Sequence, residues 1–437
     1  MHGGDAQQQD LERNTLRRVA WRLLPLLTLG YLVSFVDRSN VGFAALQMNR
    51  DVGLSQAAFG FGSGLFFLSY ALLEVPSNLL MQRFGARRWL ARIMISWGLL
   101  SAATALTRGP QSFYLLRLLL GAAEAGFFPG VVLYLTYWFP AAWRARIIAL
   151  FMIAIPLSSL LGSPLSATLL GSEGVLGLHG WQWLFLAEAL PAVLLGAFSL
   201  WWLQDGPAEA RWLSDAERGW LRARLAHEAG DGGRPVQALP LARVLRHPRV
   251  LIAALMCAGS NAVSQSLSIW QPQIIKSFGI SAAQTGWVNA IPFGLASALM
   301  IVWGRRSDRR GERLWHTAIP LTLVGAGLLG TLAVSALWPT VALLSVVLVS
   351  TYAFKGPFWA LSTEWLAAPS AAGGIAFINA AGAAATFAGS WLLGVLRERT
   401  GSYPLGLLPM ALLCLAGVAT LLWTQRRDLP AARGALS

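Results

Sequence analysis

Charged residues are scarce in this sequence: Asp, Glu, Lys and Arg make up 12% of 437 residues, about half the share found in soluble proteins. Cysteine is scarcer still, and Cys257 and Cys414 both lie in apolar stretches, where a small buried thiol is the ordinary interpretation. No spacing typical of a zinc, haem or disulfide site is present. A nucleophile–base motif and a strand-flanked phosphate loop are also missing. These absences argue against an enzyme, and we expect no metal and no cofactor.

Long hydrophobic runs are the feature that the sequence has in abundance, since 55% of its residues are hydrophobic. About twenty apolar residues are needed to cross the hydrocarbon core of a bilayer as a helix. Runs of that length recur along the chain and predict an all-α membrane protein with twelve transmembrane helices. No separate cleavable signal is apparent, so the first run is expected to act as a signal anchor. The twelve segments lie at about 19–39, 58–81, 88–107, 112–136, 145–170, 182–203, 250–275, 282–304, 314–337, 340–363, 372–396 and 404–424.

The net charge of +14 raises the question of nucleic acid, but the positions of the basic residues argue against it. With a cytoplasmic N-terminus, 26 of the 34 Lys and Arg residues lie in or next to the tails and loops on the cytoplasmic side. This asymmetry follows the positive-inside rule and predicts that both termini are cytoplasmic. The expected surroundings are therefore a lipid bilayer, with no nucleic acid.

The longest polar interval divides the segments into two sets of six. This predicts a cytoplasmic tail at 1–18, a first half at 19–203, a linker at 204–247, a second half at 248–424 and a cytoplasmic tail at 425–437. Two such halves are expected to pack pseudo-symmetrically about a central pathway.

Within the linker, residues 213–228 have an apolar stripe, with Ser214 as a possible N-cap and Glu217 three residues later. This pattern predicts a surface helix with a capping box. Residues 229–235, AGDGGRP, are expected to be a flexible linker.

A weak internal repeat supports the division into halves. Two short loops, at equivalent places in the two halves, carry Arg, then Gly two residues later, then Arg after two more. Any short cytoplasmic loop is rich in such residues, but a random match at both places is much less expected. The residues are Arg83, Gly85 and Arg87 in the first loop, and Arg309, Gly311 and Arg313 in the second.

The second loop resembles the G-x-x-x-D-R-x-G-x-R signature of the major facilitator superfamily, through Gly304, Asp308, Arg309, Gly311 and Arg313. The first loop departs from that signature, because Asn78 replaces the leading glycine and Gln82 the aspartate. An acid-mediated interlock is therefore in doubt in the first half. Within the superfamily, the stretches YLVSFVDRSNVG, LLRLLLGAAEAGFFPGVVLYLTYWFP, WLFLAEALPAV and GGIAFINAAG look like the anion:cation symporter family. This resemblance implies the major facilitator fold and transport of organic anions.

Four ionisable residues stand inside predicted segments one and four: Asp37, Arg38, Arg117 and Glu124. Seven residues are almost two helical turns, so Arg117 and Glu124 should project from one face, about 10 Å apart. Charged groups at this depth normally face a bundle interior or a watery cavity. Two interpretations stay open: a fixed ion-pair network that holds helices together, or a transport site whose carboxyl groups gain and lose protons.

The family resemblance favours the transport site and implies roles. Asp37 and Glu124 would carry protons, and Arg38 would meet the substrate anion. Arg117 is expected to pair with Glu124 and to contribute to the substrate site. The resemblance also implies that Trp359 and Asn379 contact substrate.

Other polar residues at membrane depth are candidates on chemical grounds. Tyr70 is as consistent with a donor to a substrate carboxylate as with an ordinary packed tyrosine. Asn261 and Gln265 share a helical face and suit either substrate hydroxyls or hydrogen bonds between helices. Lys355 is not predicted by the resemblance; we expect it to face the cavity, with pairing to Glu364 or Glu74 as the alternative. Glu74 and Glu188 are expected to serve gating or capping.

The predicted function is a proton-coupled symporter that imports a small organic anion, a carboxylate or dicarboxylate, by alternating access. The alternative is a proton-driven exporter of amphipathic or cationic drugs, which an aromatic cavity would suit but three intramembrane cations would not. The expected location is the bacterial inner membrane. The expected partners are the anion and protons, and we expect a monomer.

Overall fold

Helices make up nearly all of the structure, a computed structural model that describes residues 2–230, 247–365 and 371–434. Twelve spans in this part of the chain are long and apolar enough to cross a membrane, and no strand occurs in it. The predicted all-α membrane architecture is confirmed.

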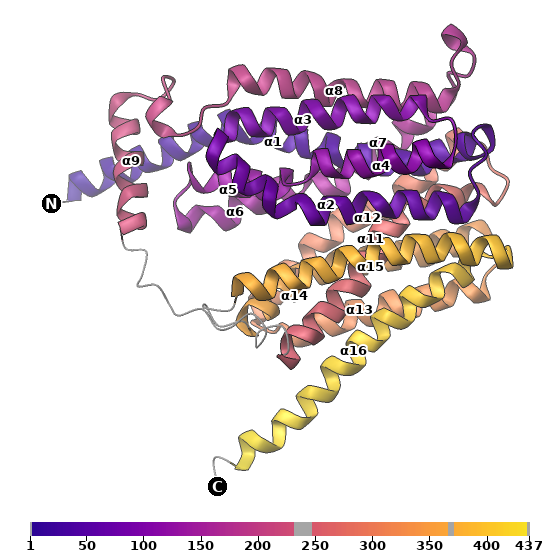
Figure 1. Cartoon of the computed structure of the whole chain (residues 1–437). Helices are drawn as coiled ribbons and strands as arrows, with labels where there is room; N and C mark the ends of the chain where they lie inside the picture. Colours follow the sequence, from indigo (N-terminus) through magenta and orange to yellow (C-terminus); the bar gives the residue numbers. More distant parts are fainter. Residues whose placement is uncertain (1, 231–246, 366–370, 435–437) are drawn as a thin grey trace.

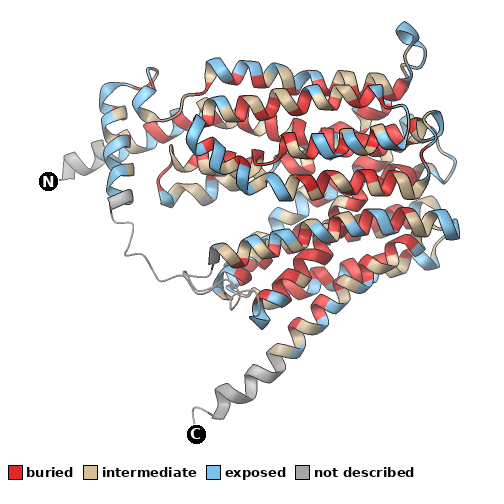
Figure 2. Ribbon diagram, in the orientation of Figure 1, coloured by how far each residue is buried: buried red, intermediate tan, exposed pale blue. Residues whose placement is uncertain are grey.

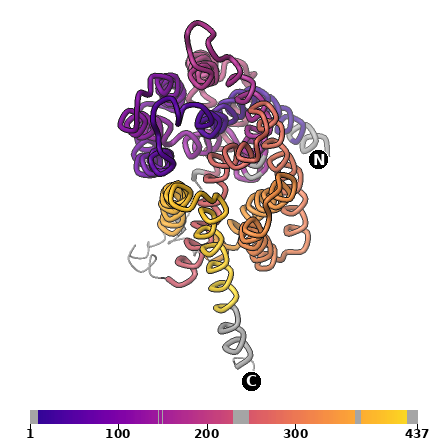
Figure 3. The backbone as a smooth tube through the Cα atoms, turned by 90° about the vertical axis from the view of Figure 1, so that its right-hand side faces the viewer, coloured from indigo at the N-terminus to yellow at the C-terminus, as the bar shows by residue number. Residues whose placement is uncertain are grey.

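The first six spans form one half of the molecule and the last six form the other (Figures 1 and 3). In the first half the fourth span is divided into α4 and α5, and the fifth into α6 and α7. The helices of the first half are α1 (His2–Asp51), α2 (Gln56–Phe84), α3 (Ala86–Ala103), α4 (Pro110–Glu124), α5 (Phe127–Thr136), α6 (Ala141–Met152), α7 (Ala154–Leu169) and α8 (Gly180–Trp202). Those of the second half are α11 (Pro248–Lys276), α12 (Ala282–Arg310), α13 (Leu314–Gly330), α14 (Leu337–Trp365), α15 (Ala371–Thr400) and α16 (Tyr403–Gly434). Single 3-10 turns are η1 (Thr104–Leu106), η2 (Val175–Gly177), η3 (Pro207–Glu209) and η4 (Thr331–Ala333).

Several helices are longer than the hydrophobic runs that predicted them, whereas α3 and α13 end before the predicted 107 and 337. The first run was predicted at 19–39, whereas α1 extends from His2 to Asp51, because polar residues can continue a helix beyond the apolar stretch. The breaks in the fourth and fifth spans were not predicted. In the fourth, Gly126 has φ 85°, a left-handed conformation that glycine adopts at little cost.

The predicted surface helix is present as α9 (Asp215–Gly230). Its capping box is confirmed, since the Ser214 N–H donates to Glu217 Oε2 at 2.9 Å and the Glu217 N–H donates to Ser214 Oγ at 3.3 Å. An ion pair of 3.1 Å between Arg18 and Glu217 attaches α9 to α1. Residues 229 and 230, predicted as linker, belong to α9, and the remaining predicted linker residues, 231–235, lie outside the described residues.

The two repeated loops both turn at a glycine of positive φ, but their conformations differ. Gly85 has φ 85° and ψ 147°, whereas Gly311 has φ 61° and ψ 15°, the left-handed helical region. In the second loop Asp308 forms an ion pair of 2.7 Å with Arg313. In the first loop, where Gln82 replaces the aspartate, the Arg87 backbone N–H instead donates to Asp205, which follows α8, at 2.8 Å. The missing carboxylate is thus supplied from another part of the chain.

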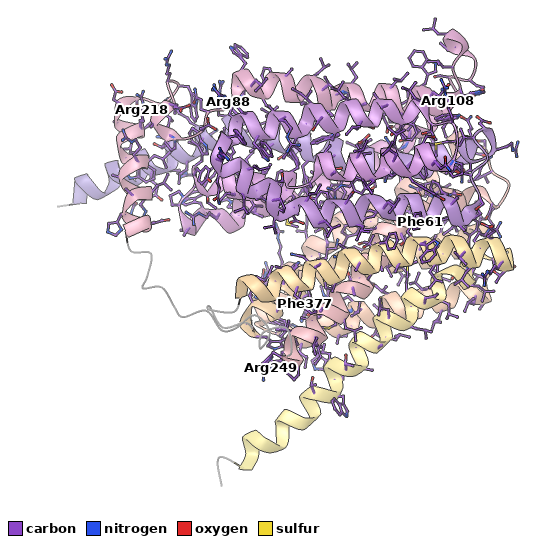
Figure 4. All side chains as sticks on the ribbon, viewed as in Figure 1. Phe61, Arg88, Arg108, Arg218, Arg249 and Phe377 are labelled. Carbon is purple, nitrogen blue, oxygen red and sulfur yellow. The ribbon has the colours of Figure 1, made fainter. Side chains whose placement is uncertain are left out.

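The chain termini and α9 lie toward one end of the bundle, here called the linker end (Figure 1). Arg88 and Arg218 also lie at the linker end, and Arg108 lies at the opposite end (Figure 4). The halves meet where α1 packs on α11, α2 on α15, and α7 on α12. Of these helices α11 is the most buried, and the buried residues lie in the interior of each half and between the halves (Figure 2).

Contacts between the halves gather at the opposite end. Hydrogen bonds that join the halves include Asn289 to Ser163, 2.8 Å, and the Ala57 N–H to Glu398, 2.8 Å. Phe61 of α2 also packs edge-on against Phe387 of α15 there. The two halves are therefore closed against each other at the opposite end.

Candidate functional site

Arg38 and Glu124 form an ion pair in the interior of the first half. Arg38 Nε and Nη2 lie 2.8 and 2.7 Å from Glu124 Oε1. The Glu124 side chain is fully buried, and that of Arg38 is 10% exposed. The expectation that Glu124 pairs with Arg117 is therefore wrong. Sequence spacing along α4 placed Arg117 and Glu124 on one face, but it could not show that Arg38 of α1 reaches the same carboxylate first.

Arg117 is the unusual member of the cluster. It is fully buried, and its three side-chain nitrogens have no hydrogen-bond partner among the described residues. Its guanidinium lies 4.8 Å from the centre of the Phe66 ring, and the guanidinium of Arg38 lies 5.6 Å from the same ring. Phe66 thus stands beside both cations, and cation–π attraction partly compensates for their burial. A buried guanidinium without hydrogen bonds is costly and suits a site where an anion arrives.

Asp37 points away from this pair, because adjacent residues on a helix are about 100° apart. Its Oδ1 accepts hydrogen bonds from Ser101 of α3 and, at 3.0 Å, from Asn40 of α1. Its Oδ2 has no partner among the described residues. Asp37 is 2% exposed. Its carboxyl group accepts hydrogen bonds from hydroxyl and amide donors and contacts no cation among the described residues.

Glu124 is the last residue of α4, directly before the break at Ala125 and Gly126. Interrupted helices near the membrane midplane leave backbone groups free and are a recurrent feature of transport sites. The break gives the Glu124 backbone a local freedom that a continuous helix would not.

Aromatic rings line the side of Arg38 that is not occupied by Glu124. The Arg38 guanidinium lies 4.8 Å from the ring centres of both Phe35 and Tyr70. Tyr70 is half-buried, so it lies beside the cation at the edge of the interior. Tyr31 stacks on Phe151 at 4.4 Å and packs edge-on against Phe35 at 5.0 Å.

In the second half, Lys355 of α14 is half-buried. Its Nζ lies 5.0 Å from the centre of the Tyr352 ring, and Cys257 of α11 is its electrostatic neighbour. No carboxylate of the described residues forms an ion pair with Lys355, so pairing with Glu364 or Glu74 is not observed.

The remaining candidates differ in exposure. Asn261, Gln265 and Trp359 are half-buried, and Asn379 is exposed. Asn261 Nδ2 is 3.5 Å from Cys257 Sγ, one turn earlier on the same helix. Across the described chain neither Asn261 nor Gln265 makes a side-chain hydrogen bond to another helix, which leaves their polar groups free for a ligand. The sequence candidates therefore fall into a buried group (Asp37, Arg38, Arg117, Glu124) and a more accessible group (Tyr70, Asn261, Gln265, Lys355, Trp359, Asn379).

Sequence reasoning missed several contributors. Asn40 stands one helical turn after Asp37, and Phe66 one turn before Tyr70, so helical spacing could have drawn attention to both. Ser101 of α3 gave no such signal, since its approach to Asp37 depends on how α1 and α3 pack. No group of three or more metal-ligating side chains lies together in the described part of the chain.

Comparisons with known proteins identify the family and the fold. The family model described as "Major Facilitator Superfamily" matches residues 27–364. A protein of Agrobacterium vitis named as a candidate tartrate transporter is 45% identical over 94% of this chain and 92% of its own length. A quinolone resistance transporter of Acinetobacter baumannii is 40% identical over 94% of each chain. A solved structure of the xylose transporter of E. coli has the same fold, with TM-score 0.73, 16% identity, and coverage of 92% of this chain and 95% of that one.

Proposed function

Since the chain belongs to the Major Facilitator Superfamily, we propose that it is a proton-coupled symporter that imports a small organic anion, a carboxylate or dicarboxylate, by alternating access. It is a secondary transporter and a multi-pass protein of the bacterial inner membrane. The relatives reported above are named as transporters. The proposal adds the coupling ion, the direction and the class of substrate.

One observation carries the proposal: two arginines and two acids share the interior, and one arginine, Arg117, has no hydrogen-bond partner among the described residues. With both acids ionised, the four groups have no net charge. Protonation of Asp37 and Glu124 leaves two positive charges in a medium of low dielectric, where an anion is strongly attracted. Proton binding and anion binding therefore favour each other, and this is the thermodynamic requirement of symport.

Arg38 is the proposed contact for the substrate carboxylate. It is the less buried of the two arginines and is flanked by Tyr70. Glu124 binds the Arg38 guanidinium through one carboxylate oxygen, Oε1. A substrate carboxylate can therefore compete with Glu124 for the same guanidinium. Glu124 would then take up a proton or turn toward Arg117, and the helix break that follows it permits that movement.

Lys355 is the proposed contact for a second carboxylate. Its ammonium group is half-buried and without an ion-pair partner in the described residues, on the face of α14 that also carries Tyr352. A dianion could then bridge the halves, with one end at Arg38 and the other near Lys355. Asn261 and Gln265 would offer amide groups to hydroxyls between them, and Trp359 and Asn379 would complete the wall.

The test is uptake into proteoliposomes of purified protein, with radiolabelled tartrate as the probe. An inward proton gradient should drive accumulation above equilibrium in the wild type. Asp37→Asn and Glu124→Gln should each abolish this accumulation, while at least one of them retains exchange of labelled for unlabelled tartrate, because exchange need not release the proton. Full proton-driven accumulation in both variants would show that neither acid couples transport.

A proton-driven exporter of drugs is the second candidate, and the relative named as a quinolone resistance transporter favours it. The same proteoliposomes distinguish the two functions. Counterflow of labelled tartrate without counterflow of a labelled quinolone supports the symporter. The reverse result would favour the exporter and overturn the proposal.

A further inference from the structure

A third buried acid, Glu188 of α8, lies beside the α1 acid but takes no part in the Arg38–Glu124 pair. It is 4% exposed. Its Oε1 accepts a hydrogen bond of 2.6 Å from Ser166 of α7, and its Oε2 has no hydrogen-bond partner among the described residues. Gating or capping was expected for Glu188 from the sequence, yet its surroundings are those of an interior polar group eight residues into α8.

Asn40 connects Glu188 with Asp37. Its Nδ2 donates to Asp37 Oδ1 at 3.0 Å, and the same side chain lies beside the Glu188 carboxyl group. An amide has two N–H donors, so Asn40 is able to serve both carboxyl groups at once. Each of these carboxyl groups also has one hydroxyl donor, Ser101 for Asp37 and Ser166 for Glu188.

No basic side chain of the described residues pairs with either acid. The helices packed on α8 are α1, α3 and α7. α7 carries no ionisable residue, and the three arginines of α3, Arg87, Arg88 and Arg92, lie in its first two turns at the linker end. From α1, the group that acts electrostatically on Glu188 is Asp37, and Asp37 in turn is under the influence of Arg117 and Glu124.

Two neighbouring carboxyl groups in a buried place cannot both ionise cheaply, because each negative charge disfavours the other. A pair of this kind holds one proton over a wide range of pH, and its titration belongs to the pair rather than to either residue. The single amide between them fits such a shared state, since it stabilises whichever group is ionised.

We propose that Glu188 is a proton-binding residue that shares a proton with Asp37 through Asn40, which makes a third carboxyl group part of the coupling machinery. This proposal rests on the proposed proton symport and adds to it the site where the Asp37 proton is held. The carrier then has a two-carboxyl unit in α1 and α8, next to and separate from the Arg38–Glu124 pair.

The sign of the expected pH effect follows from the pairing. An ionised Glu188 makes the first proton bind at higher pH than an isolated Asp37 would allow. Glu188→Gln removes that charge, so the pH of half-maximal tartrate uptake should fall by about one unit. Asn40→Ala removes the donor that stabilises the ionised forms, so in this variant the same midpoint should rise.

The experiment measures initial tartrate uptake against pH in proteoliposomes of the wild type, Glu188→Gln and Asn40→Ala. Glu173→Gln, an exposed acid before α8, is the matched control and should leave the midpoint unchanged. Tartrate exchange in Glu188→Gln shows that this variant is folded and binds substrate. If Glu188→Gln shows no exchange, the pH midpoint of Asn40→Ala tests the proposal independently.

The outcomes separate this proposal from the function on which it rests. Absence of proton-driven uptake in the wild type contradicts the proposed symport itself. Proton-driven uptake in the wild type, with an unchanged midpoint in both Glu188→Gln and Asn40→Ala, overturns the role of Glu188 alone. Shifts of both variants in the same direction would also overturn it, because a shared proton requires opposite signs.

Discussion

Among the residues of the second half, Lys355 gives the clearest prediction for a single substitution. It is an ammonium group within a membrane span and has no ion-pair partner among the described residues. If it receives the second carboxylate of a dianion, Lys355→Ala should weaken tartrate binding about a hundredfold, equivalent to about 2.8 kcal/mol. Binding of a monocarboxylate of similar size should change far less. Competition of unlabelled acids against labelled tartrate measures both affinities.

The chain contains one other lysine, which serves as a matched control. Lys276, at the end of α11, donates to the Ile280 carbonyl at 2.6 Å and lies away from the cluster, so Lys276→Ala should leave both affinities unchanged. Equal losses for the dicarboxylate and the monocarboxylate in Lys355→Ala, or no loss for either, would show that Lys355 is structural.

At the scale of elements, the break between α4 and α5 is the feature most directly linked to the site. A Cβ atom added at Gly126 would lie only 2.6 Å from the Cβ atom of Ser77. The φ angle of Gly126 is 85°. Gly126→Ala therefore combines a clash with a left-handed backbone, a strain of about 1–3 kcal/mol. The midpoint of thermal unfolding in detergent should fall by about 2 °C or more, and tartrate uptake should fall with it.

Gly219→Ala is the control for that substitution. Gly219 lies on the exposed side of α9, and nothing lies within 4 Å of the added methyl group. Because alanine is the better helix former by about 1 kcal/mol, this variant should be at least as stable as the wild type. If Gly126→Ala left stability and uptake unaltered, the left-handed glycine in the break after Glu124 would not be required for folding or for transport.

At the scale of the whole molecule, the distribution of basic residues bears on the orientation in the membrane. The arginine asymmetry leads us to propose that the linker end faces the cytoplasm, which places the end at which the two halves are closed on the outer side. Arg88 and Arg108 are exposed at the two ends of the molecule (Figure 4). In intact cells an impermeant maleimide should label Arg108→Cys, and should label Arg88→Cys only after permeabilisation.

Cys257 and Cys414 are both buried, so the unmodified chain supplies the labelling background. Labelling of Arg88→Cys in intact cells, with protection of Arg108→Cys, would reverse the orientation. The end at which the halves are closed would then face the cytoplasm.

The sequence by itself determined the helical membrane fold, because twelve apolar runs of spanning length leave the backbone few other ways to satisfy its hydrogen bonds in lipid. It also determined the division into halves and the position of Asp37, Arg38, Arg117 and Glu124 within spanning helices, since that position follows from the order of residues along the chain. The capping box of α9 and the paired glycine loops depend on local contacts and were predictable for the same reason.

Only the tertiary structure decided which charges meet. Glu124 pairs with Arg38 rather than with Arg117 on its own helix. The packing of α1 within the first half brings the Arg38 guanidinium closer to the Glu124 carboxylate than helical spacing brings that of Arg117. The substitution of Asp205 for the missing loop aspartate and the approach of Glu188 to Asn40 are likewise contacts between distant segments. Such contacts depend on the rotation and packing of whole helices, and the spacing of residues along one helix does not contain that information.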